Sequence, residues 1–165
     1  MLMESAMTQQ DEKSAQGTVV GIHVAPAAGT AMHAVEEVLA VEGKGLAGDR
    51  YFAGAGVPTE PEQSGKHVTL VETEALDALH QDYGIDVQPS ETRRNIATRG
   101  VSLNDLVGHE FIIGEVRLRG VELCEPCVHS VPTPKALRGL VHRGGLRADI
   151  IASGTIHVGD SVKPS

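Results

Sequence analysis

The chain has 165 residues and a mass of 17.4 kDa, and 41% of its residues are hydrophobic, which suits one compact domain with at most a tail. Aromatic residues make up only 2%, which argues against the stacking surfaces of single-strand nucleic-acid binders. The net charge of −8 argues against a surface for polyanions or a basic face for membranes. We therefore expect an aliphatic core and neither nucleic acid nor membrane as a partner.

The charge is unevenly distributed along the chain. Residues 1–82 carry 4 basic and 13 acidic side chains, whereas residues 83–165 carry 10 basic and 9 acidic ones. Eight arginines and Lys135 fall in the stretch from Arg93 to Arg147, enough for a local basic pocket. This distribution predicts a pocket for a small anion about the size of a phosphate.

The N-terminal residues 1–16 lack the cationic start and apolar run of a secretory signal, and we expect a disordered tail there. No stretch approaches the roughly 20 apolar residues of a membrane span. We therefore expect a cytoplasmic protein in which residues 17–165 form a single domain. In a reducing compartment its two cysteines, Cys124 and Cys127, would be free thiols.

The first predicted elements are strands. β-branched residues favour a strand over 17–26. The stretch 32–41 favours a second strand, although its Ala, Glu and Leu residues also allow a helix. Frequent glycine and proline over 43–65 predict a long, mobile loop.

The next elements include the clearest helix. A short strand over 67–71 precedes apolar residues at helical spacing over 73–83, and Gly84 ends that helix. The remaining expected elements are a helical turn in 102–108, strands over 110–113 and 115–124, a short helix over 135–141, and two strands within 148–162 joined at Ser153 and Gly154. Many short strands without regular strand–helix alternation predict a mainly β, α+β domain that resembles a barrel, not a doubly wound sheet.

Residues 43–50, GKGLAGDR, formally contain the glycine spacing of a dinucleotide fingerprint. A pyrophosphate needs a helix N-terminus directly after the glycines, whereas a loop rich in Gly and Pro follows here. We interpret the segment as a turn with positive φ angles.

Cys124 and Cys127 carry the strongest chemical signal. A zinc site would need further ligands such as His129 and His142, and a thioredoxin-like pair would need a βαβ setting that the sequence does not indicate. A single working thiolate and a pair of inert structural cysteines both remain open. Strand alternation predicts that Cys124 is half-buried, whereas Cys127 follows Pro126 in a loop and is the expected reactive thiol.

Two arginine-containing segments could hold an anion. Arg93, Arg94 and Asn95 fall at an expected chain reversal, where arginine can bind phosphate by two parallel hydrogen bonds and asparagine can recognise a heterocycle. The sequence HRGGLR places a Gly pair, with free backbone N–H groups, between Arg143 and Arg147. The alternatives are a solvated arginine cluster and an ordinary glycine turn.

Six segments, taken in their order, resemble the MOSC domain, the module at the C-terminal end of molybdenum-cofactor sulfurases that also occurs as small stand-alone bacterial proteins. The resemblance spans residues 17–162. Its segments are GKGLAGDR (43–50), HVTLVETEAL (67–76), ETRRNIATRG (91–100), LNDLVGHEF (103–111), LCEPC (123–127) and HRGGLRADI (142–150), before the terminal GTIHVGD (154–160). It implies a β-barrel-like fold with few helices and binding of molybdenum cofactor (molybdopterin), a pterin with a phosphate and a dithiolene-held metal.

The resemblance also implies roles for single residues. By position, Cys127 looks like the family's cysteine, and Arg93 and Asn95 look like its R-x-N. Cys124 departs from the single-cysteine form, and Arg94 stands where some relatives have proline. Some family members look like reductases of N-hydroxylated compounds with molybdenum on the cysteine thiolate, and others are proposed to carry sulfur for metal–sulfur cluster or cofactor assembly.

The preferred hypothesis is a molybdenum-dependent oxidoreductase in which Cys127 ligates the metal and a separate electron donor serves the reduction of a small-molecule substrate. The residues expected to hold the cofactor are Arg93, Arg94, Asn95, Arg143 and Arg147. One alternative is a sulfur carrier with a sulfur donor protein, in which Cys124 resolves a persulfide on Cys127 as a disulfide. Another is a non-catalytic module that binds or stores the cofactor.

Overall fold

Short strands dominate the computed structural model, which describes residues 16–27, 29–50, 52, 67–125 and 138–165. In chain order its elements are β1 (Gly17–Val24), β2 (His33–Val35), β3 (Glu37–Val41), β4 (Gly45–Leu46), β5 (Val68–Glu72), α2 (Thr73–Tyr83), the 3-10 helix η1 (Pro89–Thr92), β6 (Ile96–Arg99), the 3-10 helix η2 (Leu103–Leu106), β7 (Glu110–Ile113), β8 (Val116–Leu123), β9 (Leu146–Ala152), β10 (Gly154–His157) and β11 (Ser161–Pro164).

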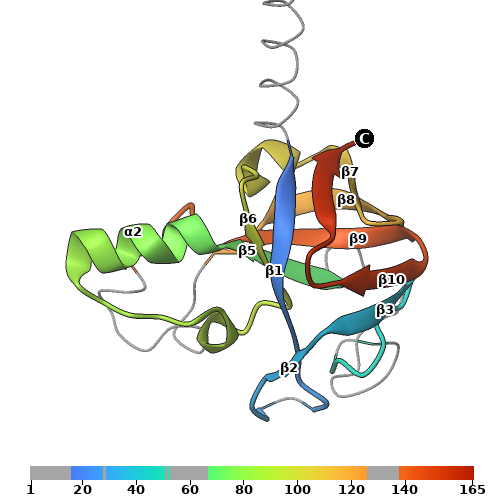
Figure 1. The fold of residues 1–165 in the computed structure, drawn as a ribbon, viewed down its shortest axis with the longest axis horizontal. Coiled ribbons are helices and arrows are strands. Elements are labelled where there is room, and N and C mark those ends of the chain that lie inside the picture. The colour runs from blue at the N-terminus through green and yellow to red at the C-terminus, as the bar shows by residue number, and fades with distance from the viewer. Residues whose placement is uncertain (1–15, 28, 51, 53–66, 126–137) are drawn as a thin grey trace, which may run out of the picture.

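Seven strands close into a barrel in the order β11–β7–β8–β9–β5–β6–β1, and β1 returns to β11 (Figure 1). Strand β2 extends the sheet beside the second half of β1, and β10, β3 and β4 form a separate small sheet. Strands β5 and β6 are parallel, and the other described strand pairs are antiparallel. The expected mainly β, barrel-like fold is therefore confirmed.

Aliphatic side chains fill the barrel because alternate residues of each strand point inward. Ile22 of β1, Leu70 of β5, Ile96 of β6 and Leu118 of β8 belong to one buried cluster, together with Phe111. Removing such a side chain from water contributes about 1.5–3 kcal/mol each. The residues between these inward positions face away from the barrel interior, and on β5 and β6 several of them, such as Thr69 and Ala97, are buried as well. The candidate site lies on this outer side of β1, β6, β5 and β9.

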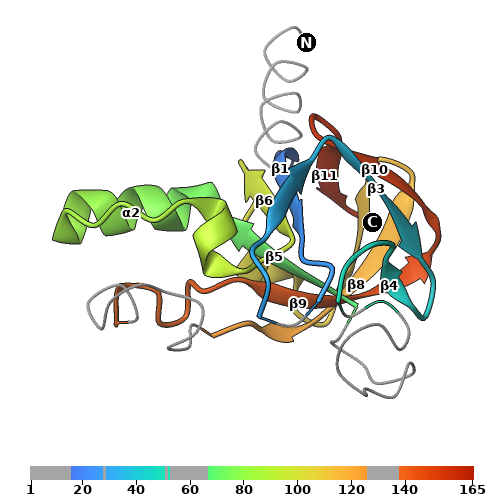
Figure 2. The same ribbon diagram turned by 90° about the horizontal axis from the view of Figure 1, so that it is seen from below.

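Helix α2 connects β5 to β6 and projects from the barrel as an arm (Figures 1 and 2). It ends at Gly84, which adopts a left-handed conformation with φ 67°. Leu76 and Leu79 on its buried face pack with Val87 and Leu140 in a second apolar cluster. The predicted helix over 73–83 is confirmed, and within the described chain no helix is long and apolar enough to cross a membrane.

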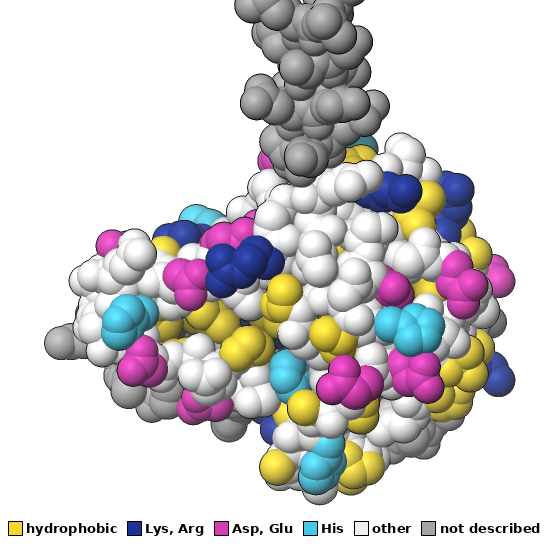
Figure 3. Space-filling model, in the orientation of Figure 1, with side chains coloured by type: hydrophobic (Ala, Val, Ile, Leu, Met, Phe, Trp, Pro, Cys, Tyr) yellow, Lys and Arg dark blue, Asp and Glu magenta, His cyan; other side chains and the backbone are white. Residues whose placement is uncertain are grey.

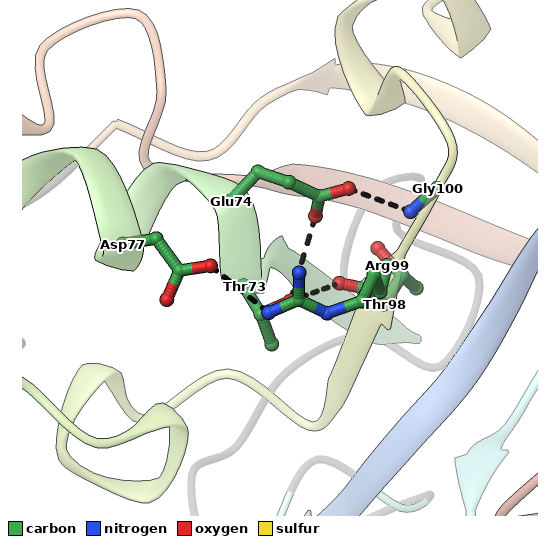
Figure 4. Close-up of polar contacts among 6 residues, drawn as sticks. All are labelled: Thr73, Glu74, Asp77, Thr98, Arg99 and Gly100. Atoms are coloured by element: carbon green, nitrogen blue, oxygen red, sulfur yellow. Dashed lines mark hydrogen bonds and ion pairs between the residues drawn. The ribbon is translucent and has the colours of Figure 1, made fainter.

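The start of α2 is fastened to the end of β6 by polar contacts (Figure 4). The Thr73 hydroxyl donates to the carbonyl of Thr98, and the amide of Gly100 donates to the Glu74 carboxylate. One turn later, Arg99 and Asp77 form an ion pair of 2.9 Å. These contacts fix helix α2 where it leaves the barrel. On the face of the molecule seen in Figure 3, acidic and basic side chains are interspersed.

Strand β6 is the main element that the sequence did not reveal. Only Ile96–Arg99 form it, and its pairing partners are β5 in parallel and β1 in antiparallel register. Strand β5, helix α2 and strand β6 form one βαβ unit, and the cysteine pair, which follows β8, is not part of it. Four residues with one large aliphatic side chain are a weak strand signal, and the pairing with two neighbours decides the conformation.

Other predictions hold with adjustments. The stretch 32–41 is extended, as β2 and β3, and Gly43, Gly45 and Gly48 of the glycine segment all have positive φ angles. The C-terminal region contains three strands where two were expected, because a turn at Gly159 starts β11. The expected loop over 43–65 contains the short strand β4, and most of its residues after 50 lie outside the described residues. The expected tail lies almost wholly outside them too, as does part of the 135–141 helix, and the division into tail and single domain stays a prediction.

The close approach of β8 to η2 gives a test of the fold. A Cβ at Gly120 would collide with the main-chain oxygen of Leu106. We expect Gly120→Ala to lower the free energy of unfolding, measured by urea denaturation, by on the order of 3 kcal/mol, because neither backbone can move easily. Gly108→Ala is the control, since nothing lies within 4 Å of its Cβ. Its positive φ should cost only about 1 kcal/mol, and equal losses in the two variants would contradict this account.

Candidate functional site

Arg93 occupies the junction between η1 and β6. Its φ of 61° is unusual for a residue with a side chain and costs on the order of 1 kcal/mol. This conformation sends its guanidinium group toward the β1–β2 connection, where Nη1 donates to the carbonyl of Thr30 at 2.8 Å. The other terminal nitrogen, Nη2, is buried and has no hydrogen-bond partner among the described residues.

Asn95 links three strands through its buried side-chain amide. Its Oδ1 accepts hydrogen bonds from both the amide and the hydroxyl of Thr69 on β5, each at 3.1 Å. Its Nδ2 donates to the carbonyl of His23 on β1, also at 3.1 Å. With Oδ1 occupied twice, one Nδ2 proton remains for a ligand. Asn95 therefore fixes the backbone around Arg93.

Arg94 binds the chain segment before Cys127 to the start of β6, next to Arg93 and Asn95. It is only 7% exposed, and Nη2 donates to the carbonyls of Cys124 and Glu125 at 3.0 and 3.2 Å. Its Nε donates to Gly144 at 2.9 Å, and its Nη1 donates to Thr92 at 3.3 Å. These bonds bring Cys124 and Glu125, just after β8, and Gly144 of the HRGGLR turn (142–147) to the Arg93–Asn95 segment.

The glycine turn is held from a second side. Glu125 accepts a hydrogen bond from the amide of His142 at 2.8 Å, and its other oxygen lies 3.4 Å from His142 Nδ1. Asn104 of η2 donates to the carbonyl of His142 at 2.8 Å. Gly145 has φ 124° and packs so closely on the carbonyl of Leu70 that a side chain would not fit. The turn is therefore held at His142 by two side chains and buried at Gly144 and Gly145, while the side chains of His142 and Arg143 are exposed.

Asp49, at the end of the GKGLAGDR segment, also reaches this region. It is 2% exposed, and its Oδ1 accepts a hydrogen bond from the amide of Ala25, just after β1, at 3.0 Å. The carboxylate that follows the GKGLAGDR glycines therefore binds the backbone where the β1–β2 connection begins. No sequence argument assigned Asp49 a role, although its place directly after three turn glycines was a usable signal.

His23 on β1 is a site residue that the sequence analysis missed. Its main chain pairs with Asn95, and its ring lies over Gly21, whose Cβ would come within 3.1 Å of the ring carbon Cε1. Burial lowers the pKa of His23 below its ordinary value of 6.5, so the neutral imidazole is favoured. Its Nδ1 is buried and, within the described chain, has no hydrogen-bond partner.

The two arginines of HRGGLR lie in different surroundings. Arg147 on β9 stands opposite Thr69 of β5, so it shares the outward face of Asn95, and its Nε lies 3.8 Å from a Glu122 oxygen. Arg143 is exposed, and its charge acts on Glu72, at the end of β5. Burial raises the pKa of Glu72, while a hydrogen bond from the Leu103 amide and the Arg143 charge oppose that rise. Arg147 therefore shares a face with Thr69 and Asn95, whereas the charge of Arg143 acts at the end of β5.

The two cysteines differ in what the structure describes. Cys124 is a free thiol, 2% exposed and thus more deeply buried than strand alternation predicted, because its amide continues the pairing with Gly145. Cys127 and His129 lie outside the described residues. Among the residues that are described, no group of three or more His, Cys, Asp or Glu side chains could hold a metal ion.

Several solved structures share this fold. The YuaD protein from Bacillus subtilis superposes with a TM-score of 0.76 at 16% identity, over 90% of this chain and 95% of that one. YiiM from Geobacillus stearothermophilus superposes with a TM-score of 0.67 at 13% identity, over 90% of this chain and 75% of that one. YiiM from Escherichia coli superposes with a TM-score of 0.61 at 19% identity, over 91% of this chain and 69% of that one. At these identities the likeness establishes the fold alone.

Comparison with known sequences identifies the family of this chain but no individual relative. No curated protein sequence matches the chain. The family model of the MOSC domain, however, matches residues 53–163, which is more than half of the chain and includes β5–β10 and the cysteine segment. The predicted resemblance is thereby confirmed, and the chain belongs to the MOSC domain family.

Proposed function

We propose that this protein binds molybdenum cofactor and reduces N-hydroxylated small molecules, with molybdenum held by the Cys127 thiolate and electrons supplied by a separate partner protein. The observation that carries the proposal is the buried, unpartnered Nη2 of Arg93 in the described structure. An unpaired buried N–H costs about 1–3 kcal/mol, and more on a charged group, so this position calls for an acceptor. The phosphate of the cofactor is such an acceptor.

The surrounding residues fit the cofactor in their chemistry. Arg93 supplies a charged donor for the phosphate, and the free Nδ2 proton of Asn95 supplies a neutral one beside it. His23 Nδ1 and Arg147 lie on the same outward face. Ligand roles for Arg94 and Arg143 stay predictions. When bound, the cofactor supplies a metal able to transfer two electrons.

The short stretch of chain between the Arg93–Asn95 segment and the Cys127 thiol also supports the proposal. Arg94, the neighbour of Arg93, is bonded to the carbonyl of Glu125, and only one residue separates Glu125 from Cys127 in the chain. Two peptide units span at most about 7.6 Å between Cα atoms. A cysteine thiolate is a ligand that suits a soft metal centre. In this proposal Cys127 holds the metal while Arg93 and Asn95 orient the phosphate.

Metal retention tests the role of the thiol. In cells that synthesise the cofactor, we expect the wild-type protein to carry stoichiometric molybdenum and Cys127→Ser to lose it, because serine does not replace a thiolate ligand. Cys124→Ala should retain the metal and the reduction of a hydroxylamine with an artificial electron donor. Elemental analysis and a pterin fluorescence assay after oxidation provide the measurements. Molybdenum retained by Cys127→Ser at the wild-type level would contradict the proposal.

The neutral state of His23 predicts a pH dependence of stability. Burial lowers the pKa of His23 in the folded protein, so the unfolded chain binds the proton at higher pH than the folded one. The free energy of unfolding should therefore fall as the pH drops from about 7.5 to about 5.5. His23→Gln should reduce this slope, by no more than the one-proton limit of about 1.4 kcal/mol per pH unit. Identical slopes in urea denaturation would show that His23 titrates normally.

A further inference from the structure

We propose that Arg94 is a positioning residue that never touches the cofactor and holds the cysteine segment in reach of it. This inference rests on the proposed function of the site. It divides the work of two adjacent arginines, since Arg93 would bind the phosphate while Arg94 places the thiol. The described contacts of the two side chains differ in the way that this division requires.

The described hydrogen bonds of Arg94 go to main-chain oxygens on three separate segments. They reach Thr92 beside it, Cys124 and Glu125 just after β8, and Gly144 in the HRGGLR turn. A planar guanidinium group can serve these directions at once because its five N–H groups form a rigid fork. A lysine ammonium group cannot span them. Arg93, by contrast, makes one such bond and keeps a buried donor free.

The two carbonyls of Cys124 and Glu125 are the last described points of the chain before Cys127. Holding two successive carbonyls fixes both the position and the direction in which the chain proceeds. The amide of Cys124 donates to Gly145 at 2.8 Å, so this stretch is bonded on both of its edges. Freeing it would let Cys127 move relative to Arg93, while leaving Arg93 itself in place.

Glu125 supports the same arrangement from outside. Its carboxylate holds the amide of His142, so the cysteine segment and the glycine turn are joined by a side chain as well as by Arg94. The Glu125 side chain is 45% exposed, which makes substitution there much safer for folding than at the buried Arg94. Glu125→Ala is therefore the second variant that keeps the proposal testable if Arg94→Gln does not fold.

The test compares Arg93→Gln, Arg94→Gln, Arg94→Lys and Glu125→Ala with the control Arg99→Gln, which removes an exposed arginine paired to Asp77. Three quantities are measured: calorimetric affinity of the cofactor-free protein for inorganic phosphate, molybdenum retained per chain, and hydrogen exchange at the amides of Cys124 and His142. Arg93→Gln should lower phosphate affinity at least about tenfold, because one charge-assisted hydrogen bond is lost.

The Arg94 variants should leave phosphate affinity within about twofold, since Arg93 is intact, while exchange at the two amides rises about tenfold and retained molybdenum falls. Arg94→Lys should fall between wild type and Arg94→Gln, and Glu125→Ala should change exchange in the same direction. The Arg99 control should alter none of the three quantities.

Two results would overturn the proposal. Equal loss of phosphate affinity in Arg94→Gln and Arg93→Gln would make Arg94 a direct ligand. Unchanged exchange in folded Arg94→Gln, or in Glu125→Ala if Arg94→Gln does not fold, would show that the segment needs no such support. If the wild-type protein retains no molybdenum, the proposed function fails by itself, and the exchange readout still decides whether Arg94 positions the segment.

Discussion

The site depends on one buried guanidinium group and the main-chain oxygens around it. Arg94 is nearly inaccessible to water, and burying a charged side chain is costly unless its hydrogen bonds are replaced within the protein. Carbonyls from the β8 end and the glycine turn provide that replacement. These segments come together only when the barrel has closed, so folding of the barrel and assembly of the site are one event.

Around this group, neighbouring residues in the chain have different tasks. Asn95 ties β5, β6 and β1 together and so sets the local backbone. Arg93 accepts a strained φ angle and presents a buried donor without a described partner. Such a combination of strain and an unsatisfied polar atom is costly for stability, and it is typical of positions kept for binding. The segment thus combines a structural anchor with a binding group.

Much of the fold could be predicted from local patterns, and some of the site could not. The helix over 73–83 has apolar residues at helical spacing and a terminal glycine, so its signal is complete within eleven residues. Strand β6 has no such signal, because its extended form comes from pairing with β1 and β5. The arginines were found as candidates by type. The sequence could not show that Arg93 keeps a free donor while Arg94 binds carbonyls, because two of those carbonyls lie 30 and 50 residues away in the chain.

The amino-acid sequence alone determined the aliphatic core, the mainly β class, the family resemblance and the short set of residues able to carry the chemistry, because these follow from composition and local order. Tertiary structure decided which of those residues meet. It placed His23 beside Asn95, brought Asp49 to the amide of Ala25 after β1, set Arg147 opposite Thr69, and buried Cys124. The physical reason is that closing a barrel sets strands from distant parts of the chain side by side, and register then fixes which side chains share a face.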